Sequence, residues 1–105
     1  MGAIRMTQST AAVLQAVAAG HMYGFDIMDA TGLQSGTVFP ILRRLESAGL
    51  LRGRWEPVSD AHRGSRPQRR LYELTGVGIE ALAAAREKLS HARSLLDSLI
   101  SSKES

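Results

Sequence analysis

Apolar positions in the segment TGLQSGTVFPILRRLESAGLL, residues 31–51, predict an α-helix with one apolar face. They follow the spacing i, i+3, i+4 and i+7, at Val38, Ile41, Leu42 and Leu45. At about 100° per residue the opposite face is small, polar and cationic, with Gly36, Pro40, Arg43 and Ser47, and with Thr37 and Arg44 beside them. Gly32 and Gly49 stand where left-handed backbone can end the preceding helix and then this one. A short helix, a glycine-containing turn and a helix with a basic outer face are the layout of a DNA-reading helix-turn-helix.

Two helices are predicted before this one. The first follows a cap at Thr7 or Ser9 and extends to about residue 19, and the second covers residues 24–31. The second offers three candidates for the core, Phe25, Ile27 and Met28. Ser35 is the expected N-cap of the third helix. Pro40 is expected to open its first turn locally, because proline cannot donate a bond back to the preceding turn.

A pair of strands is predicted after Gly49. Residues 51–56 alternate with a period of two, and so do residues 68–74, with Tyr72 and Leu74 on the inner side. The polar segment 57–67 between them is expected to be a loop. Trp55 fits the core or a cross-strand contact with Tyr72 better than a ligand platform. Two strands around a basic loop form the wing of a winged helix-turn-helix, so the predicted fold is mainly α with a two-stranded β-wing.

A long last helix is predicted from Thr75, its cap, through residues 76–100, over roughly 37 Å at ~1.5 Å per residue. Its apolar positions alternate by three and four, and they are Leu82, Ala85, Leu89, Ala92, Leu96 and Leu99. We interpret them as a dimerisation seam, because one winged-helix unit cannot bury a helix of this length. The chain therefore divides into a DNA-binding domain, residues 1–75, and a dimerisation helix with a frayed tail, residues 76–105.

Composition excludes several classes of protein. The chain of 105 residues has no cysteine, which excludes disulfides and thiolate metal sites and is compatible with a reducing compartment. No long apolar run or signal-peptide pattern occurs, so we expect a cytoplasmic protein without membrane contact. His21, His62 and His91 are far apart and lack a carboxylate cluster, and no catalytic constellation is present. We therefore expect no metal, no cofactor and no enzyme activity.

Positive charge is concentrated in the middle of the chain. The net charge is +3, but residues 43–70 hold eight arginines against three acids, as a polyanion-binding face requires. Arg43 is the predicted base reader, because a guanidinium can donate two parallel bonds to guanine. Arg44 suits a phosphate contact or a surface salt bridge, and Tyr23 a phosphate contact or packing between helices. Further candidate contacts at the start of the third helix and in the wing are Ser35, Gly36, Thr37, Phe39, Pro40, Arg63, Gly64, Arg66 and Arg69, with Arg66 favoured at the loop tip. Arg5, in a short N-terminal arm, suits solvation better than a phosphate contact.

The order of these residues resembles the PadR family of bacterial transcriptional regulators. The matching strings are YGFDI at 23–27, TGL at 31–33, SGTVFP at 35–40, LRRLE at 42–46, GLL at 49–51 and WE at 55–56, continuing through Gly64, Arg66-Pro67, Arg70, Tyr72, Leu74-Thr75 and Gly78. The resemblance covers roughly residues 10–85, and the short C-terminal part looks like the subfamily with a single dimerisation helix. It implies a dimeric winged helix-turn-helix repressor that releases its operator on a stimulus.

Two positions depart from the family pattern. Phe39 stands where the family commonly has tyrosine, so a phosphate contact from that hydroxyl is missing. Some short members bind flat aromatic drugs against a tryptophan on the last helix, whereas here Trp55 is the only tryptophan and lies in the first predicted strand. A drug-stacking pocket of that kind is therefore not expected.

The leading hypothesis is a homodimeric, sequence-specific DNA-binding repressor acting on a palindromic operator in double-stranded DNA, with a possible small-molecule effector. The alternative is a winged-helix module that docks an acidic protein partner. Arg43, Arg44 and the wing arginines favour DNA, since a neutral or acidic third helix would favour the alternative.

Overall fold

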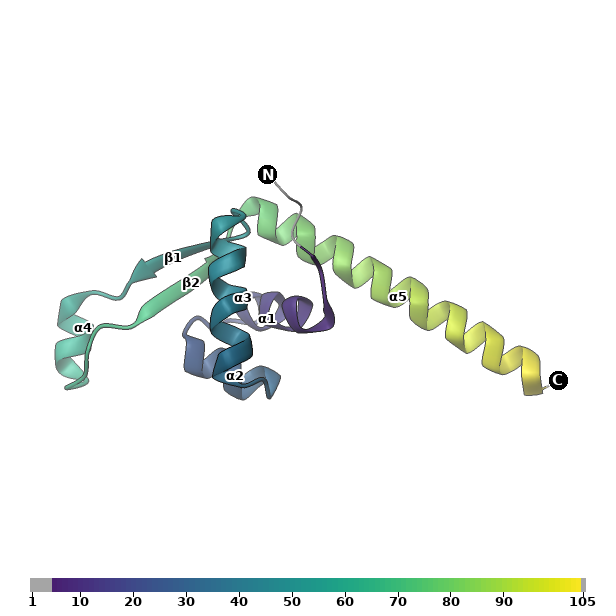
Figure 1. Ribbon diagram of the computed structural model, residues 1–105, viewed down its shortest axis with the longest axis horizontal. Coiled ribbons are helices and arrows are strands. Elements are labelled where there is room, and N and C mark those ends of the chain that lie inside the picture. Colours follow the sequence, from purple (N-terminus) through teal and green to yellow (C-terminus); the bar gives the residue numbers. More distant parts are fainter. Residues whose placement is uncertain (1–4, 105) are drawn as a thin grey trace.

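Five helices and a two-stranded sheet make up the computed structural model, which describes the backbone of residues 5–104 and side chains as far as residue 101. The elements are α1 (Gln8–Ala18), α2 (Gly24–Thr31), α3 (Ser35–Ser47), β1 (Leu51–Trp55), α4 (Val58–Arg63), β2 (Arg70–Leu74) and α5 (Gly76–Glu104). Figure 1 shows α1, α2 and α3 gathered at the centre, the sheet and α4 extending to one side and α5 to the other. The result is an elongated molecule of 63 × 30 × 22 Å. The first four residues of the expected N-terminal arm lie outside the described residues.

The core lies among α1, α2 and α3, where the apolar faces predicted from the sequence meet. Its fully buried side chains include Val13, Leu14, Ile27, Val38, Leu42 and Leu45. Thr7 is the N-cap of α1, because its hydroxyl accepts the N–H of Thr10 at 3.1 Å. α2 has the predicted bounds and ends at Gly32, whose φ of +73° lies in the left-handed region. Phe25 was predicted to enter the core and is instead 70% exposed.

The third helix, α3, differs in one detail from expectation. Ser35 is its first helical residue, and the N-cap is Gln34 without a side-chain bond, so the prediction of Ser35 as N-cap is wrong. Pro40 lies inside α3, which is not broken there and continues to Ser47. The N–H groups of Thr37 and Val38 donate to the Gln34 carbonyl at 3.0 and 2.9 Å, which satisfies two donors of the first turn.

The wing is an antiparallel pair whose register places Leu51 opposite Leu74 and Trp55 opposite Arg70. Trp55 is 60% exposed and does not face Tyr72, which contradicts both sequence-based placements of the tryptophan. The connecting segment contains α4, so the prediction of a loop over residues 57–67 is wrong in part. Tyr23 also bridges to β2, which attaches the wing to the start of α2.

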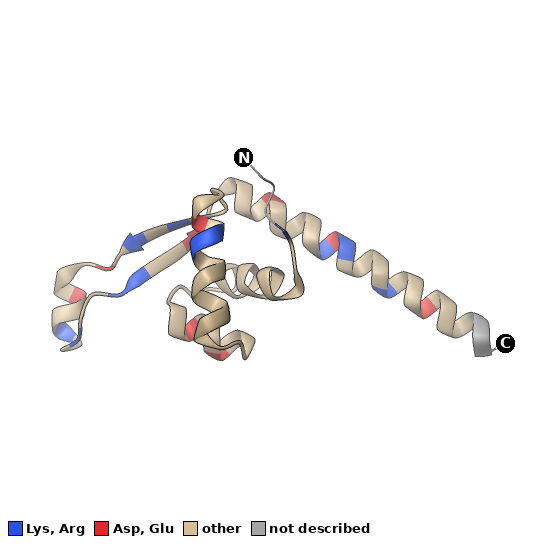
Figure 2. Ribbon diagram, viewed as in Figure 1, with Lys and Arg blue, Asp and Glu red and all other residues tan. Residues whose placement is uncertain are grey.

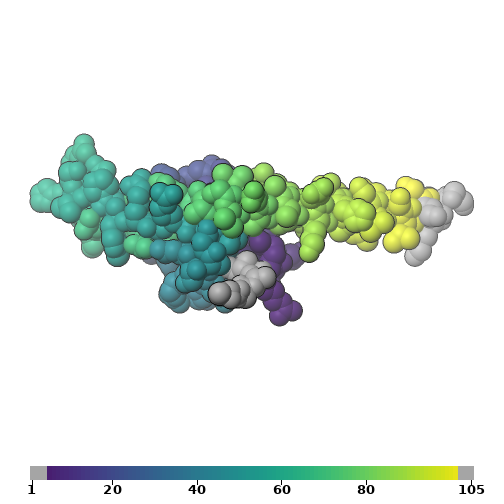
Figure 3. Space-filling view, turned by 90° about the horizontal axis from the view of Figure 1, so that it is seen from above, coloured from purple at the N-terminus to yellow at the C-terminus, as the bar shows by residue number. Residues whose placement is uncertain are grey.

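α5 begins as predicted and extends further. The Thr75 hydroxyl accepts the N–H of Gly78 at 3.0 Å, which confirms its role as cap. Leu82 and Ala85 are buried against the rest of the same chain, and α1 contacts this part of the helix. Beyond them α5 projects away from the core (Figures 1 and 3) and continues through Glu104, where a frayed tail was expected. No helix in the described part of the chain is both long and apolar enough to cross a membrane.

Candidate nucleic-acid interface

The outer face of α3 carries the polar and cationic residues that the periodicity placed there. Its exposed positions are Ser35, Gly36, Thr37, Arg43, Arg44 and Ser47, whereas Pro40 is half-buried. Figure 2 shows basic residues on the upper part of α3 and along the neighbouring wing. None of the ion pairs among the described side chains includes Arg43 or Arg44. Both guanidinium groups are therefore available for an external anion.

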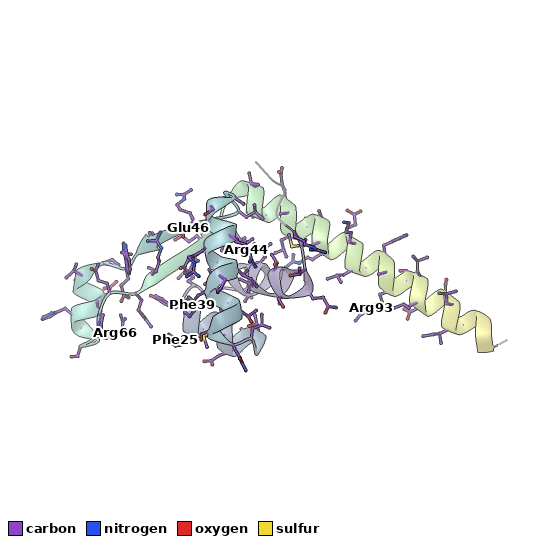
Figure 4. The ribbon with its side chains drawn as sticks, in the orientation of Figure 1. Phe25, Phe39, Arg44, Glu46, Arg66 and Arg93 are labelled. Atoms are coloured by element: carbon purple, nitrogen blue, oxygen red, sulfur yellow. The ribbon has the colours of Figure 1, made fainter. Side chains whose placement is uncertain are left out.

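Phe39 lies on the flank of α3 and packs against α2 (Figure 4). Its ring covers Gly24, where a Cβ atom would lie 2.5 Å from the Cε1 atom of Phe39. The Phe25 ring meets it edge-on, with centroids 6.3 Å apart and an interplanar angle of 77°. The half-buried Phe39 ring thus helps to fix α2 against α3, so its proposed place in a DNA contact is at the edge of the recognition surface.

A buried carboxylate organises the tip of the wing. Glu56 is only 2% exposed, and its carboxylate accepts hydrogen bonds from both terminal nitrogens of the Arg66 guanidinium, one of them at 3.2 Å. The backbone N–H of Arg69 donates to the same carboxylate at 3.1 Å. The Gln68 amide donates to the Glu56 carbonyl at 2.6 Å, which fixes the two chain segments of the wing on each other. Arg66, the residue favoured at the loop tip, is thus engaged inside the wing (Figure 4).

The charges in this cluster stabilise one another. The hydrogen bonds from the Arg66 guanidinium, with a further bond from the Arg69 backbone, lower the pKa of Glu56 although burial opposes ionisation. The bonds between Arg66 and Glu56 raise the pKa of Arg66 above its ordinary value. The pair therefore stays ionised at neutral pH and carries no net charge, while Arg69 adds one positive charge beside it.

The other basic wing residues are also in contact with neighbours. The Arg69 guanidinium lies 3.7 Å from the centroid of the Tyr23 ring, so the half-buried Tyr23 packs against an arginine of the wing, whereas the packing alternative placed it between the first two helices. Arg63 pairs with Asp60 at 2.5 Å across one turn of α4, and its side chain remains 77% exposed. Gly64 follows at the end of α4. Arg63 is consequently the most accessible of the proposed wing contacts.

A second acid, Glu46, joins the recognition helix to the wing. Its carboxylate accepts the Arg70 guanidinium at 2.6 Å, which raises the pKa of Arg70. Sequence reasoning missed both Glu46 and Glu56, because each pairs with an arginine far along the chain. An indirect signal was the glycine at position 53 in a strand, which indicates that another group approaches the backbone closely.

The predicted dimerisation seam separates into two parts. Leu82 and Ala85 are buried within the chain and are not free for a partner, which corrects their assignment. Leu89, Leu96 and Leu99 are more than half exposed, and Ala92 between them is also exposed. The outer part of α5 thus presents an uncovered apolar face.

The histidines do not come together. His21 precedes α2, His62 lies in α4 and His91 in α5, and the described residues contain no group of three potential metal ligands.

A helix-turn-helix followed by a two-stranded wing, with arginines on its recognition helix that form no ion pair among the described side chains, defines a winged-helix DNA-binding protein. Residues 13–84 match the family described as Transcriptional regulator PadR-like family. The chain belongs to this family and is a transcriptional regulator. No curated protein sequence matches it.

Solved structures show the same fold. A PadR family transcription regulator from Clostridium difficile has 17% identity and a TM-score of 0.78, covering 90% of this chain and 99% of that chain. The protein smu.1704 from Streptococcus mutans has 24% identity and a TM-score of 0.72, covering 93% of both chains. The PcaV transcriptional regulator from Streptomyces coelicolor, solved with its natural ligand, has 22% identity and a TM-score of 0.73, covering 87% of this chain and 60% of that chain.

Proposed function

We propose that the protein is a homodimeric repressor that binds a palindromic operator through α3 and the wing. The observation that carries the proposal is the exposed face of α3, where Arg43 and Arg44 form no ion pair with any side chain that the structure describes. In the major groove Arg43 would donate to a guanine, while Ser35, Thr37 and Arg44 would contact the backbone. Exposed Arg63 would reach phosphates beside the groove.

The exposed apolar face of α5 supports the dimer. Leu89, Leu96 and Leu99 recur by seven and three residues, the spacing with which two helices pack side by side. A two-fold axis through this face would relate the two recognition helices by symmetry. Two half-sites about one helical turn apart, roughly 34–36 Å, would then form an inverted repeat.

Selection from a random-sequence pool of duplex DNA tests the proposal with the full chain. We expect enrichment of an inverted repeat, with binding that weakens steeply as salt rises because phosphate contacts release counterions. Sedimentation should give a dimer. A wild-type protein that enriches no sequence, or that captures only acidic proteins, would instead support the protein-docking alternative.

Release by an effector is a second proposal, and a groove between α1 and α5 favours it. This groove has a volume of about 450 Å³ and is lined mainly by apolar groups, among them Ala11, Leu82, Ala85 and Leu89, and Arg86 also lines it. Arg86 donates to the Gln15 side chain at 2.5 and 2.8 Å across the groove. Isothermal titration with small apolar acids, followed by loss of DNA binding, tests whether this site regulates the protein. A ligand that binds without releasing DNA would contradict the regulatory role.

A further inference from the structure

The ion pair between Glu46 and Arg70 is the one direct bond between the charged side chains of the recognition helix and those of the wing in the described residues. Glu46 lies near the end of α3, and Figure 4 shows it on the side of the helix that faces the wing. Arg70 is the first residue of β2. Their side chains are about one-third exposed, which limits screening by water.

The strand between them is shaped for this pair. A Cβ atom on Gly53 of β1 would lie 2.7 Å from the Arg70 Nη2 atom and 2.9 Å from the Glu46 Oε1 atom. Such separations are too short for non-bonded atoms, so a side chain at this position would require the ends of the Arg70 and Glu46 side chains to shift. The glycine in the middle of a strand, which costs strand propensity, thereby has a structural reason.

Trp55 provides a further support for Arg70. The two residues are opposite each other in the strand register, and the guanidinium lies 5.3 Å from the centroid of the tryptophan ring. This contact accounts for a tryptophan that remains largely exposed. Arg70 is thus held by Glu46 on one side and by Trp55 on the other.

We propose that Glu46, Gly53 and Arg70 form a latch that sets the position of the wing relative to α3 for specific DNA binding. This inference rests on the proposed function and names its positioning residues. α3 reads bases while the wing contacts the adjacent backbone, so both engage one duplex only if their relative position is correct. Arg70 also keeps Glu46 away from Arg43, which lies three residues earlier on the same helix and within reach of it.

The direction in which Glu46→Gln changes DNA affinity distinguishes the latch from simple electrostatic repulsion. Glu46 is an acid beside a DNA-binding face, so removing its charge would raise affinity if it acted only by repelling phosphates. The latch predicts that Glu46→Gln lowers affinity for the enriched duplex, by about tenfold, with the salt slope unchanged. Gly53→Ala should lower affinity in the same direction but less, because the ends of both side chains can shift around the added Cβ atom, and it does so without any change of charge.

Arg70→Ala should be more severe than Glu46→Gln, because it also leaves Glu46 free to pair with Arg43. The double variant Glu46→Gln/Arg70→Ala should then bind more tightly than Arg70→Ala alone. The matched control is Glu73→Gln, which removes an ion pair of the same wing, to Arg54 at 3.0 Å, and should leave affinity unchanged. If Glu46→Gln instead raises affinity, and Arg70→Ala lowers the salt slope by about one, Arg70 is a phosphate contact and the latch is overturned.

A measurement without DNA tests the latch independently of the proposed function. Trp55 is the only tryptophan of the chain, so its fluorescence anisotropy decay reports the mobility of the ring beside Arg70. Glu46→Gln and Gly53→Ala should both increase its fast local motion, whereas Glu73→Gln should not. Unchanged decays in the first two variants overturn the latch even if the wild type binds DNA. If the decays of these two variants change but the wild-type protein enriches no duplex, the result supports the latch and rejects the DNA-binding proposal.

Discussion

The ring of Phe39 occupies the space that a side chain at Gly24 would need. A Cβ atom there would lie 2.5 Å from Cε1 and 2.7 Å from Cζ of that ring. α2 and α3 therefore approach closely because one residue lacks a side chain and the other fills the space. The position of the recognition helix depends on this contact.

Gly24→Ala should consequently destabilise the protein. Overpacking of this kind costs about 1–3 kcal/mol in the free energy of unfolding, which urea denaturation measures. Gly36→Ala is the matched control, because a Cβ atom at Gly36 meets nothing within 4 Å. It should stabilise α3 by up to about 1 kcal/mol through helix propensity. Equal effects of the two substitutions would show that Phe39 does not restrict position 24.

Arg43→Ala should relax base specificity. Loss of a two-bond contact to guanine should cost ~1–3 kcal/mol on the enriched duplex and remove the preference at one base pair. Arg44→Ala is the neighbouring control. If Arg44 contacts phosphate, this substitution should weaken binding to all duplexes alike and lower the salt slope by about one. Fluorescence anisotropy titrations with single-base variants distinguish the two. Full retention of base preference in Arg43→Ala would exclude Arg43 as the reader.

Two arginines of the wing should behave differently when replaced. Arg63 is largely exposed and its pair with Asp60 spans one helical turn, so Arg63→Ala should leave thermal stability nearly unchanged. It should still weaken binding to every duplex and reduce the salt slope. Arg66→Ala should lower the melting temperature, because it leaves the buried Glu56 carboxylate without its main partner. The opposite order of stabilities would contradict the role of Glu56 at the wing tip.

Acid should weaken the fold partly through Glu56. Because its pKa is lowered in the folded protein, its ionised form contributes stability above the pKa of an unfolded glutamate, about 4.3. That contribution is lost as pH falls from this value through the lower folded pKa. Glu56→Gln should therefore be less stable than the wild type at pH 7, and its stability should fall less between pH 5 and pH 3. Parallel pH profiles of the two proteins in urea denaturation would contradict this assignment.

Four of the five helices could be predicted because their apolar residues recur with the period of a helix. Val38, Ile41, Leu42 and Leu45 lie on one face of α3 and enter the core in the structure. α4 could not be predicted in this way, since its six residues are mostly polar and only Ala61 is buried. A single buried position defines no period.

The partners of the arginines could not be predicted either. Arg66 meets Glu56 and Arg70 meets Glu46 only after the wing has its register and lies against α3. Composition therefore indicates a basic middle segment but not which cations are neutralised. The structure leaves Arg43 and Arg44 without ion pairs among the described residues, in agreement with the face that periodicity assigned to them.

Leu96→Asp should dissociate the proposed dimer. The Leu96 side chain is 60% exposed in the single chain, and in a two-fold dimer both copies would be buried. Burial of each contributes about 1.5–3 kcal/mol, so loss of two should raise the dimer dissociation constant roughly 100-fold or more. Ile79→Asp is the control, because Ile79 is equally exposed, at 58%, but lies in the first turns of α5 away from the outer seam. Sedimentation equilibrium measures the oligomeric state of the two variants. If Leu96→Asp is a monomer and Ile79→Asp a dimer, the interface lies on the outer half of α5. If both remain dimers, the subunits associate through another surface, and the exposed leucines of α5 require a different partner.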